Sequence, residues 1–342
     1  MDEFIGIGVD LGKRYFQIHG VRSGGGPAEK RKLSRSKMHA FFSGLAPCRV
    51  GMEACGSAHH WARELGAMGH EVVLMPPAYI KPYVKRGKND AIDAAAICEA
   101  MARPDMRFVP VKSADQQALL MLHKTRELMV KQRTMSVNAL RSHLAEFGLV
   151  VAQGVGRIDD LRDLAENNPS LPDEARQAMK LSVLHIEALT RSIDAIGRKI
   201  AKAAAGDRTS RLLDRVPGVG PVTASAIAAR APNPGVFKSG RDFAAWLGLT
   251  PRQNSSGGKT RLGGITKQGN RYIRKLLVVG ATAVLRHAAS KRSGPLADWI
   301  AALRKRKPER VVTVALANKL ARVCWAIMTT GEFFRQETFA RA

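Results

Sequence analysis

The chain has 342 residues, of which 45% are hydrophobic and 25% charged, a composition that suits two or three globular domains with sizeable cores. Its 55 lysines and arginines outnumber its 29 acidic residues and give a formal net charge of +26, which favours a polyanionic partner such as nucleic acid. The sequence lacks an uninterrupted apolar run of membrane-spanning length, the basic start of a signal peptide, and cysteine spacing typical of zinc sites or disulfide frameworks. We therefore expect a cytoplasmic protein with reduced thiols and no membrane partner.

The first hundred residues alternate between strand-like and helix-like segments. Apolar runs of strand length occur at 4–9, 15–21, 48–53 and 70–75, with a short possible strand after the basic residues 30–32. Helical spacing of apolar residues occurs at 36–45, at 59–69 and up to residue 101. This order of elements predicts a mixed α/β sheet covered by helices.

Four acidic residues fall at the ends of these segments. Asp10 and Glu53 end strands, while Asp90 and Asp93 lie three residues apart in the first turn of the last helix. Each has a simpler explanation when taken alone: a turn residue, a solvated strand end, or partners of the helix dipole. Together they can meet at one edge of the sheet, where divalent cations offset the repulsion between carboxylates.

Carboxylate oxygens suit Mg²⁺, and two such ions about 3.5–4 Å apart clamp the attacking and leaving oxygens of a phosphodiester. Basic residues just before the helix can bring phosphate to this edge of the sheet. They are Lys81, Lys85, Arg86 and Lys88.

The set Asp10, Glu53, Asp90 and Asp93 resembles the DEDD tetrad of the RuvC-like domain in insertion-sequence transposases of the IS110 class, which are relatives of the Piv DNA invertases. The resemblance implies a ribonuclease-H-like α/β fold for residues 1–111. It also implies that the four acids bind Mg²⁺ and position a scissile phosphate.

Residues 112–207 are predicted to be helical. Apolar residues recur at helical spacing over 113–147 and 172–205, with Gly148, Gly154 and Gly156 between the two segments. Two long basic helices in succession indicate an antiparallel hairpin or coiled coil. Such an element can be a spacer or dimer arm, and it can also promote oligomerisation and follow a phosphate backbone.

Residues 208–342 are predicted to form a mainly α domain. Residues 216–224, Val-Pro-Gly-Val-Gly-Pro-Val-Thr-Ala, are typical of a helix-hairpin-helix motif, whose glycines let backbone amides approach a phosphate. A tight interhelical turn can have the same sequence. Later helices are expected at 272–285 and 311–328, and the basic runs near them favour phosphate contacts.

The segment 251–264 combines serine and glycine with positive charge. Its basic residues, with one just beyond it, are Arg252, Lys259, Arg261 and Lys267. Cations near a serine hydroxyl can activate it and stabilise charge developing at phosphorus, although a solvated linker has the same composition. The segment is similar to the signature of the transposase domain in the IS110 class, where the serine directly before the glycine is the nucleophile. The resemblance assigns this role to Ser256, and composition and spacing leave Ser255 open beside it.

The resemblance implies a site-specific DNA recombinase or transposase of a bacterial insertion sequence, associated with the nucleoid. Ser256 would form a covalent phosphoserine with the cut strand, so the energy of the phosphodiester is retained and no ATP is required. A structured guide RNA would pair with donor and target DNA. The active form would be a homo-oligomer, a dimer or tetramer, whose subunits share one site.

Two other functions compete with this hypothesis. A metal-dependent nuclease of Holliday-junction type would use the acids and water, and it would still cleave DNA after Ser256→Ala. A non-catalytic basic nucleic-acid-binding protein would keep every activity after Asp10→Ala.

Overall fold

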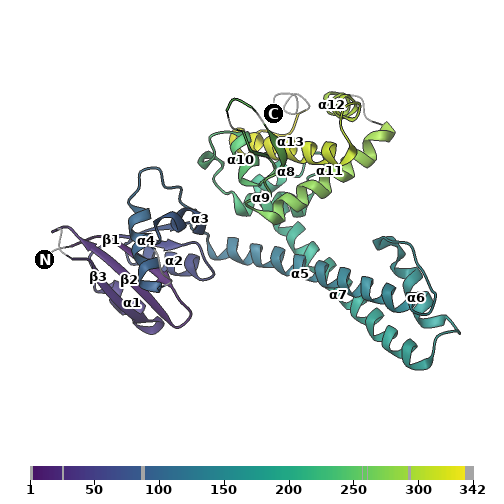
Figure 1. Cartoon of the computed structure of the whole chain (residues 1–342), viewed down its shortest axis with the longest axis horizontal. Helices are drawn as coiled ribbons and strands as arrows, with labels where there is room; N and C mark the ends of the chain where they lie inside the picture. Colours follow the sequence, from purple (N-terminus) through teal and green to yellow (C-terminus); the bar gives the residue numbers. More distant parts are fainter. Residues whose placement is uncertain are drawn as a thin grey trace. The chain divides into compact units, whose positions relative to one another are not determined.

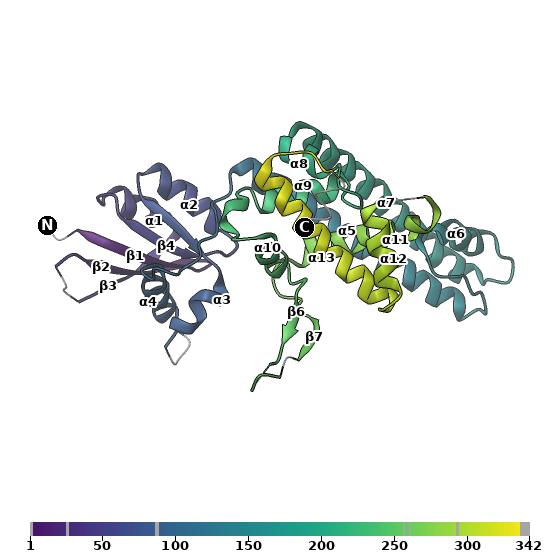
Figure 2. The same ribbon diagram turned by 90° about the horizontal axis from the view of Figure 1, so that it is seen from above.

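The structure is a computed structural model that describes residues 3–24, 27–85, 89–255, 257–259, 261–291 and 294–335 (Figures 1 and 2). Its internal contacts divide the chain into two units, residues 1–117 and 118–342. The first unit is mixed α/β and the second is mainly helical, as the sequence predicts. The domain boundaries expected after residues 111 and 207 remain predictions.

The first unit follows the predicted order of strands and helices. Its strands are β1 (Phe4–Leu11), β2 (Tyr15–Arg22), β3 (Glu29–Ser34), β4 (Arg49–Glu53) and β5 (Glu71–Met75). Its helices are α1 (Arg35–Ser43), α2 (Ala58–Ala67), α3 (Pro77–Ile80), the short 3-10 helix η1 (Lys81–Tyr83) and α4 (Asp90–Met101). Asp10 lies inside the first strand, one residue before its end.

Strand β1 lies at the centre of a five-stranded sheet of order β3-β2-β1-β4-β5. The β1–β2 and β2–β3 pairs are antiparallel, whereas the β1–β4 and β4–β5 pairs are parallel. The parallel register sets Gly8 beside Gly51 and Val9 beside Met52. This sheet order fits the ribonuclease-H-like, RuvC-like fold expected from the sequence.

The two faces of the sheet have different cover. Helices α1 and α2 lie on one face, where Phe42 and Leu65 pack with Phe16 and other buried side chains of the strands. Helix α4 lies on the opposite face, where Ile97 and its neighbours form a smaller cluster (Figure 2). Because side chains alternate along a strand, every second residue of β1 faces α4.

Glycines on the α4 face of the sheet allow this helix to approach closely. A Cβ atom added at Gly8 would overlap the carbonyl oxygen of Ala94 and lie 2.6 Å from the amide nitrogen of Cys98. One added at Gly6 or Gly51 would lie 2.9 Å from the side chain of Met101. The helix backbone therefore rests directly on the sheet, and its first turn is held close to Asp10, two residues beyond Gly8 on the same face.

The substitution Gly8→Ala is expected to destabilise the protein by about 1–3 kcal/mol, the usual range for overpacking, because α4 must move away from the sheet. The matched control is Gly66→Ala in α2, where an added Cβ meets no atom within 4 Å. Since alanine favours a helix over glycine by about 1 kcal/mol, the control should be neutral or stabilising. Urea unfolding measures both; equal effects of the two substitutions would contradict the close packing of α4.

The second unit contains the predicted long helices and several unpredicted elements. Its helices are α5 (Ala114–Ala145), η2 (Val155–Arg157), α6 (Ile158–Asn167), α7 (Asp173–Gly206), α8 (Arg208–Leu213), α9 (Pro221–Arg230), η3 (Pro234–Val236), α10 (Gly240–Trp246), α11 (Arg271–Lys291), α12 (Pro295–Arg304) and α13 (Glu309–Thr330). Its strands are β6 (Pro251–Gln253) and β7 (Leu262–Ile265), an antiparallel pair. Helices α6, α10 and α12 and both strands are absent from the predicted elements.

Helices α5 and α7 run in opposite directions and form an arm, as predicted (Figure 1). Leu140 and Leu144 of α5 pack with Val183 and Ile186 of α7, and α6 contributes Leu161 to the same core. The arm is thus a three-helix element. Its closed, apolar interior explains why the long helices are stable outside the main core.

A buried hydrogen-bond network joins α5 to the rest of this unit. The ring of His123, 1% exposed, bonds through Nδ1 to the Tyr272 hydroxyl at 3.1 Å and through Nε2 to the Ser225 hydroxyl at 3.1 Å. Burial and the nearby Arg126 and Arg230 lower the pKa of His123 to about 4. The imidazole is therefore neutral at physiological pH, and the network carries no charge change there.

Helix α13 forms the centre of the C-terminal core. It is 22 residues long and apolar enough to cross a membrane by length and composition. However, Leu316, Leu320 and Cys324 have no exposed surface and pack against α10 and α11. This packing is that of a core helix, which explains why α13 is so apolar. The sequence predicts a helix at 311–328 but no uninterrupted apolar run of membrane-spanning length, so this hydropathy was not anticipated.

Candidate active site: an acidic edge and a basic hairpin

The structure brings the four acids to one edge of the sheet in the first unit. Continuing the β1–β4 register from Gly8 and Gly51 sets Asp10 beside Glu53, on the face that α4 covers. Asp90 and Asp93 occupy the first turn of α4, and the Asn89 side chain caps this turn by accepting a hydrogen bond from the amide of Ala91 at 3.0 Å. The three elements therefore aim their carboxylates at a common place.

The pKa of Asp10 reflects its burial and its nearness to the other three carboxylates. Burial, followed by the negative charges of Asp90, Asp93 and Glu53, raises it from 3.8 to about 6. Burial and the charge of Asp93 also raise the pKa of Glu53. The neighbouring carboxylates thus make ionisation of Asp10 and Glu53 less favourable, and a bound cation would offset this repulsion.

The donor set fits Mg²⁺ by its chemistry. Among the described residues no three His, Cys, Asp or Glu side chains are close enough together to enclose a metal ion. Asp90 is exposed, however, and its charge contributes to the raised pKa of Asp10, so the two carboxylates belong to one electrostatic group. Hard oxygen donors in this number are what Mg²⁺ requires, and no softer sulfur or imidazole ligand stands among these four.

In metal-free buffer, Asp10→Asn is expected to raise the melting temperature by a few degrees above pH 6. The unfolded chain has a pKa of 3.8 at this position and the folded chain one of about 6. The folded state therefore binds an extra proton between these values, and ionisation of Asp10 costs stability that is absent below about pH 4 and complete above about pH 6. Thermal unfolding with EDTA from pH 4 to 8 tests this. The exposed Asp105→Asn control should show no such pH dependence, and a gain for Asp10→Asn that shrinks as pH rises would contradict the prediction.

The structure describes only some of the basic residues that were predicted beside the acids. Lys85 is exposed, after η1 and before α4. Arg86 and Lys88 lie outside the described residues. Their contribution to phosphate binding stays a prediction.

The basic serine segment is a β-hairpin, where a flexible loop was expected. Strands β6 and β7 project from the helical body of the second unit (Figure 2). The amide of Asn254 donates to the carbonyl of Arg261 at 2.9 Å and continues the pairing toward the tip. Arg252, Lys259 and Arg261 are exposed, so the hairpin presents positive charge along its length.

Near the tip of the hairpin the structure describes one of the two candidate serines, Ser255. The Ser255 hydroxyl accepts a hydrogen bond from the amide of Arg261 at 3.2 Å, so this side chain helps to close the hairpin. Ser256 itself lies outside the described residues. Gly257 and Gly258 follow it with φ of 54° and 76°, a turn that glycine adopts without strain.

The base of the hairpin is held by contacts that the sequence did not reveal. The guanidinium of Arg274 donates to the carbonyls of Leu247 and Gln268, at 2.8 and 3.0 Å, on the two sides of the base. The Asn318 side chain of α13 donates to the carbonyl of Leu249 at 3.1 Å. These residues position the hairpin; an arginine soon after a glycine-rich segment was the only signal for them in the sequence. Lys267, predicted to bind nucleic acid, lies in this base with a φ of 57°.

The helix-hairpin-helix segment packs inward. Helices α8 and α9 form the expected pair, but the turn between them lies against α11: a Cβ at Gly218 would be 2.8 Å from the carbonyl oxygen of Gly280. The glycine at this turn, with a φ of 82°, thus serves a protein contact. An added Cβ at Gly220, by contrast, would meet no atom within 4 Å, and phosphate binding by this motif stays a prediction.

Comparison with known proteins agrees with both halves of this arrangement. Residues 7–148 match the family model of DEDD transposases of the IS110 type, and residues 210–294 match the model described as the transposase IS116/IS110/IS902 family. A transposase-family protein of Sinorhizobium fredii is 48% identical over 336 residues, covering 98% of this chain and 87% of its own. The transposase for insertion sequence element IS1328 of Yersinia enterocolitica is 39% identical, covering 96% of this chain and 98% of its own. The transposase for insertion sequence element IS1111A of Coxiella burnetii is 38% identical, covering 96% and 91%.

The protein is therefore a transposase, which is a DNA-processing enzyme. Its acidic edge lies on a mixed sheet, and its helical unit carries a basic hairpin. The chain is a member of the IS116/IS110/IS902 family of insertion-sequence transposases, with a DEDD-type domain in its first unit.

Proposed function

We propose that this transposase is a site-specific recombinase that cuts and rejoins DNA through a phosphoserine intermediate. The observation that carries the proposal is the grouping of Asp10, Glu53, Asp90 and Asp93 at one sheet edge, where burial and the charges of the other three acids raise the pKa of Asp10 to about 6. Because carboxylates repel one another, a cluster of acids costs free energy unless a bound cation offsets the repulsion. The cluster also contrasts with the net charge of +26 of the chain.

The four acids hold Mg²⁺ and orient the scissile phosphate. When bound, the metal stabilises negative charge on the phosphate oxygens and on the attacking and leaving oxygens. The exposed cations Arg252, Lys259 and Arg261 hold the DNA backbone along the hairpin and add to this charge stabilisation.

Ser256 is the nucleophile. Its Oγ forms a bond to phosphorus as the bond from phosphorus to a sugar oxygen breaks; the serine hydroxyl loses a proton and the released sugar oxygen gains one. In the second step a free hydroxyl of another strand attacks the phosphoserine and restores Ser256. The number of phosphoester bonds is unchanged, so the exchange requires no ATP. The bond that engages Ser255 with the Arg261 amide supports Ser256 for this role.

A structured guide RNA that pairs with donor and target DNA belongs to the same proposal, as does a homo-oligomer whose subunits share one site. The high positive charge of the chain supports an RNA partner in addition to DNA. The arm of α5, α6 and α7 supports subunit association, because exposed apolar side chains line it, among them Met121, Leu128, Met135, Leu181 and Leu184.

The proposal is tested by incubating the purified chain with its candidate RNA, end-labelled donor DNA and Mg²⁺, then separating the products in denaturant. A labelled band that migrates with the protein and disappears after protease treatment is the expected result. Cleaved DNA without such a band would establish a nuclease that uses water, and intact DNA with retained binding would favour a non-catalytic binding protein.

A further inference from the structure

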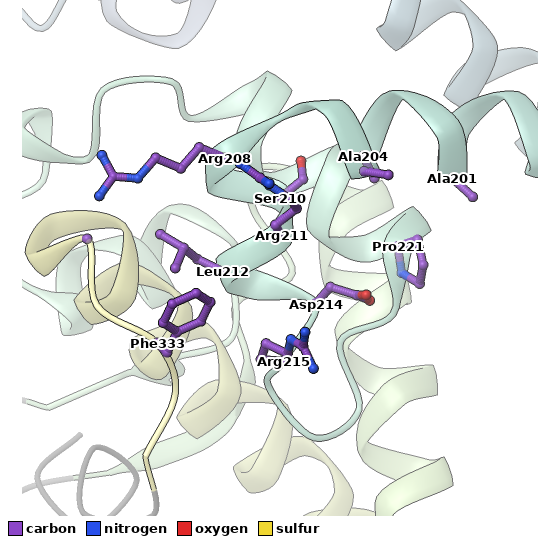
Figure 3. A pocket seen from close by; sticks show the side chains of 12 residues that line it. Ala201, Ala204, Arg208, Ser210, Arg211, Leu212, Asp214, Arg215, Pro221 and Phe333 are labelled. Carbon is purple, nitrogen blue, oxygen red and sulfur yellow. The ribbon is translucent and has the colours of Figure 1, made fainter.

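The helical unit contains an open hollow that is lined by no residue of the acidic edge or of the serine hairpin (Figure 3). Its volume is about 560 Å³, within the range of about 300–1,000 Å³ that ligand sites occupy. The walls come from the end of α7, from α8 and the turn after it, from the start of α9, and from the segment after α13. None of the lining residues belongs to the elements assigned above to catalysis.

Three arginines line the hollow in one row. Arg208, Arg211 and Arg215 follow one another at three and four residues, so they share a face of α8 and its extension. All three are exposed, and the ion pairs of the described residues do not include them. Asp214 also lines the hollow, which leaves two positive charges in excess.

Two further features add to the row of arginines. Helix α9, ten residues long, begins on the wall at Pro221, so the positive end of its dipole adds to the local potential. Phe333, in the segment after α13, also lines the hollow and exposes 62% of its surface (Figure 3). Only 6% of the residues in the chain are aromatic, so an exposed ring beside these three arginines is a distinctive combination.

A cationic row beside an exposed ring is the pattern that binds single-stranded nucleic acid. Guanidinium groups contact successive phosphates, and a base stacks on the aromatic ring, a contact worth about 1–3 kcal/mol per base. A duplex satisfies only the first half of this pattern, because its bases are already stacked in pairs.

We propose that the hollow formed by Arg208, Arg211, Arg215 and Phe333 binds a single-stranded segment of nucleic acid, with its phosphates on the arginines and a base on Phe333. DNA and RNA share this chemistry. None of the proposed catalytic residues lines the site, so the bound strand is expected to be one that is not being cut.

The test measures fluorescence anisotropy of labelled ten-nucleotide dT and U strands, and of a ten-base-pair duplex, with the full chain in EDTA. Without divalent metal no strand is cut, so the result does not depend on the phosphoserine chemistry. Each phosphate contact adds about 0.7 to the salt slope of a single strand and about fivefold to affinity at 0.1 M salt. The double substitution Arg211→Ala/Arg215→Ala should therefore weaken binding about 25-fold and lower the slope by about 1.4.

Three other variants test the proposed binding site independently of the arginine pair. Phe333→Ala should weaken single strands at least fivefold with an unchanged salt slope, and Phe333→Trp should restore binding. Asp214→Asn should strengthen binding, since it removes a negative charge from the hollow. Lys180→Ala is the matched control: it removes one exposed cation from α7, 21 residues and thus roughly 30 Å before Ala201 of the wall.

The outcomes separate the sources of the strand. A loss confined to dT assigns the site to DNA, a loss confined to U assigns it to RNA, and a loss for both shows that only the shared chemistry is recognised. Binding unchanged in the arginine pair and in Phe333→Ala overturns the proposal. So does a loss confined to the duplex, or displacement of dT by polyglutamate with the same dependence on Phe333, which would indicate an acidic protein partner.

Discussion

Replacing Ser256 with alanine is expected to abolish the covalent protein–DNA adduct while leaving DNA binding within about twofold. In the proposed mechanism the hydroxyl oxygen of Ser256 forms the bond to phosphorus, and alanine has no group that can replace it. The neighbours of Ser256 in the sequence, Ser255 and Gly257, are exposed, so we expect the substitution to leave the fold intact. Denaturing gels with labelled donor DNA measure the adduct, and a mobility shift in EDTA measures binding.

Ser255→Ala is the matched control for this experiment. It removes the acceptor for the Arg261 amide and loosens the hairpin tip, which should slow adduct formation by about tenfold or less, in line with about 1 kcal/mol for a hydrogen bond. The adduct should persist. If Ser255→Ala abolished it and Ser256→Ala did not, the two serines would exchange roles; if both variants formed it, neither serine would be the nucleophile.

Replacing Asp90 with asparagine is expected to lower strand cleavage by about 10²–10⁴-fold, because the loss of a metal-binding carboxylate removes several kcal/mol of charge stabilisation. Asp90 is exposed in the first turn of α4, and Asn89 still caps the helix after the substitution. The melting temperature should therefore change little. Single-turnover cleavage at saturating Mg²⁺ measures the effect.

Glu99→Gln provides the control on the same helix. It removes the same charge more than two turns away, where Glu99 pairs with Arg103 at the surface. Its cleavage rate should stay within about twofold, since exposed ion pairs contribute little. Equal losses in both variants would show that general charge, and not ligation, governs activity.

The sheet and its acids were predictable because they depend on local rules. Buried strands show as apolar runs, and Asp10 and Glu53 come at the ends of two such runs, so their meeting follows once the strands are parallel neighbours. Strand β3 was only a possible strand, because it lies at the sheet edge and its residues 29–32 are all charged. The roles of the acids and of Ser256 remain predictions.

The remaining elements depend on partners that are distant in the sequence. The β6–β7 hairpin is built by backbone pairing among polar and glycine residues, and Arg274 fixes its base from a helix that follows it. Helix α6 has high charge and follows a glycine-containing segment, so its buried face, Leu161 and Ala165, becomes apparent only beside the arm. The turn at Gly218 has the glycine that either a phosphate or a neighbouring helix would require, and only Gly280, more than sixty residues later, distinguishes the two.

The hydrogen bonds of His123 connect the arm to α11, the helix that follows the serine hairpin. Tyr272 is the second residue of α11, and the serine hairpin ends only a few residues before it. Moving α5 at His123 relative to the first turn of α11 would break the hydrogen bond between His123 and Tyr272. The arm is therefore connected through His123 to the helix that follows the serine hairpin, and because the imidazole is neutral at physiological pH, proton uptake does not alter this connection there.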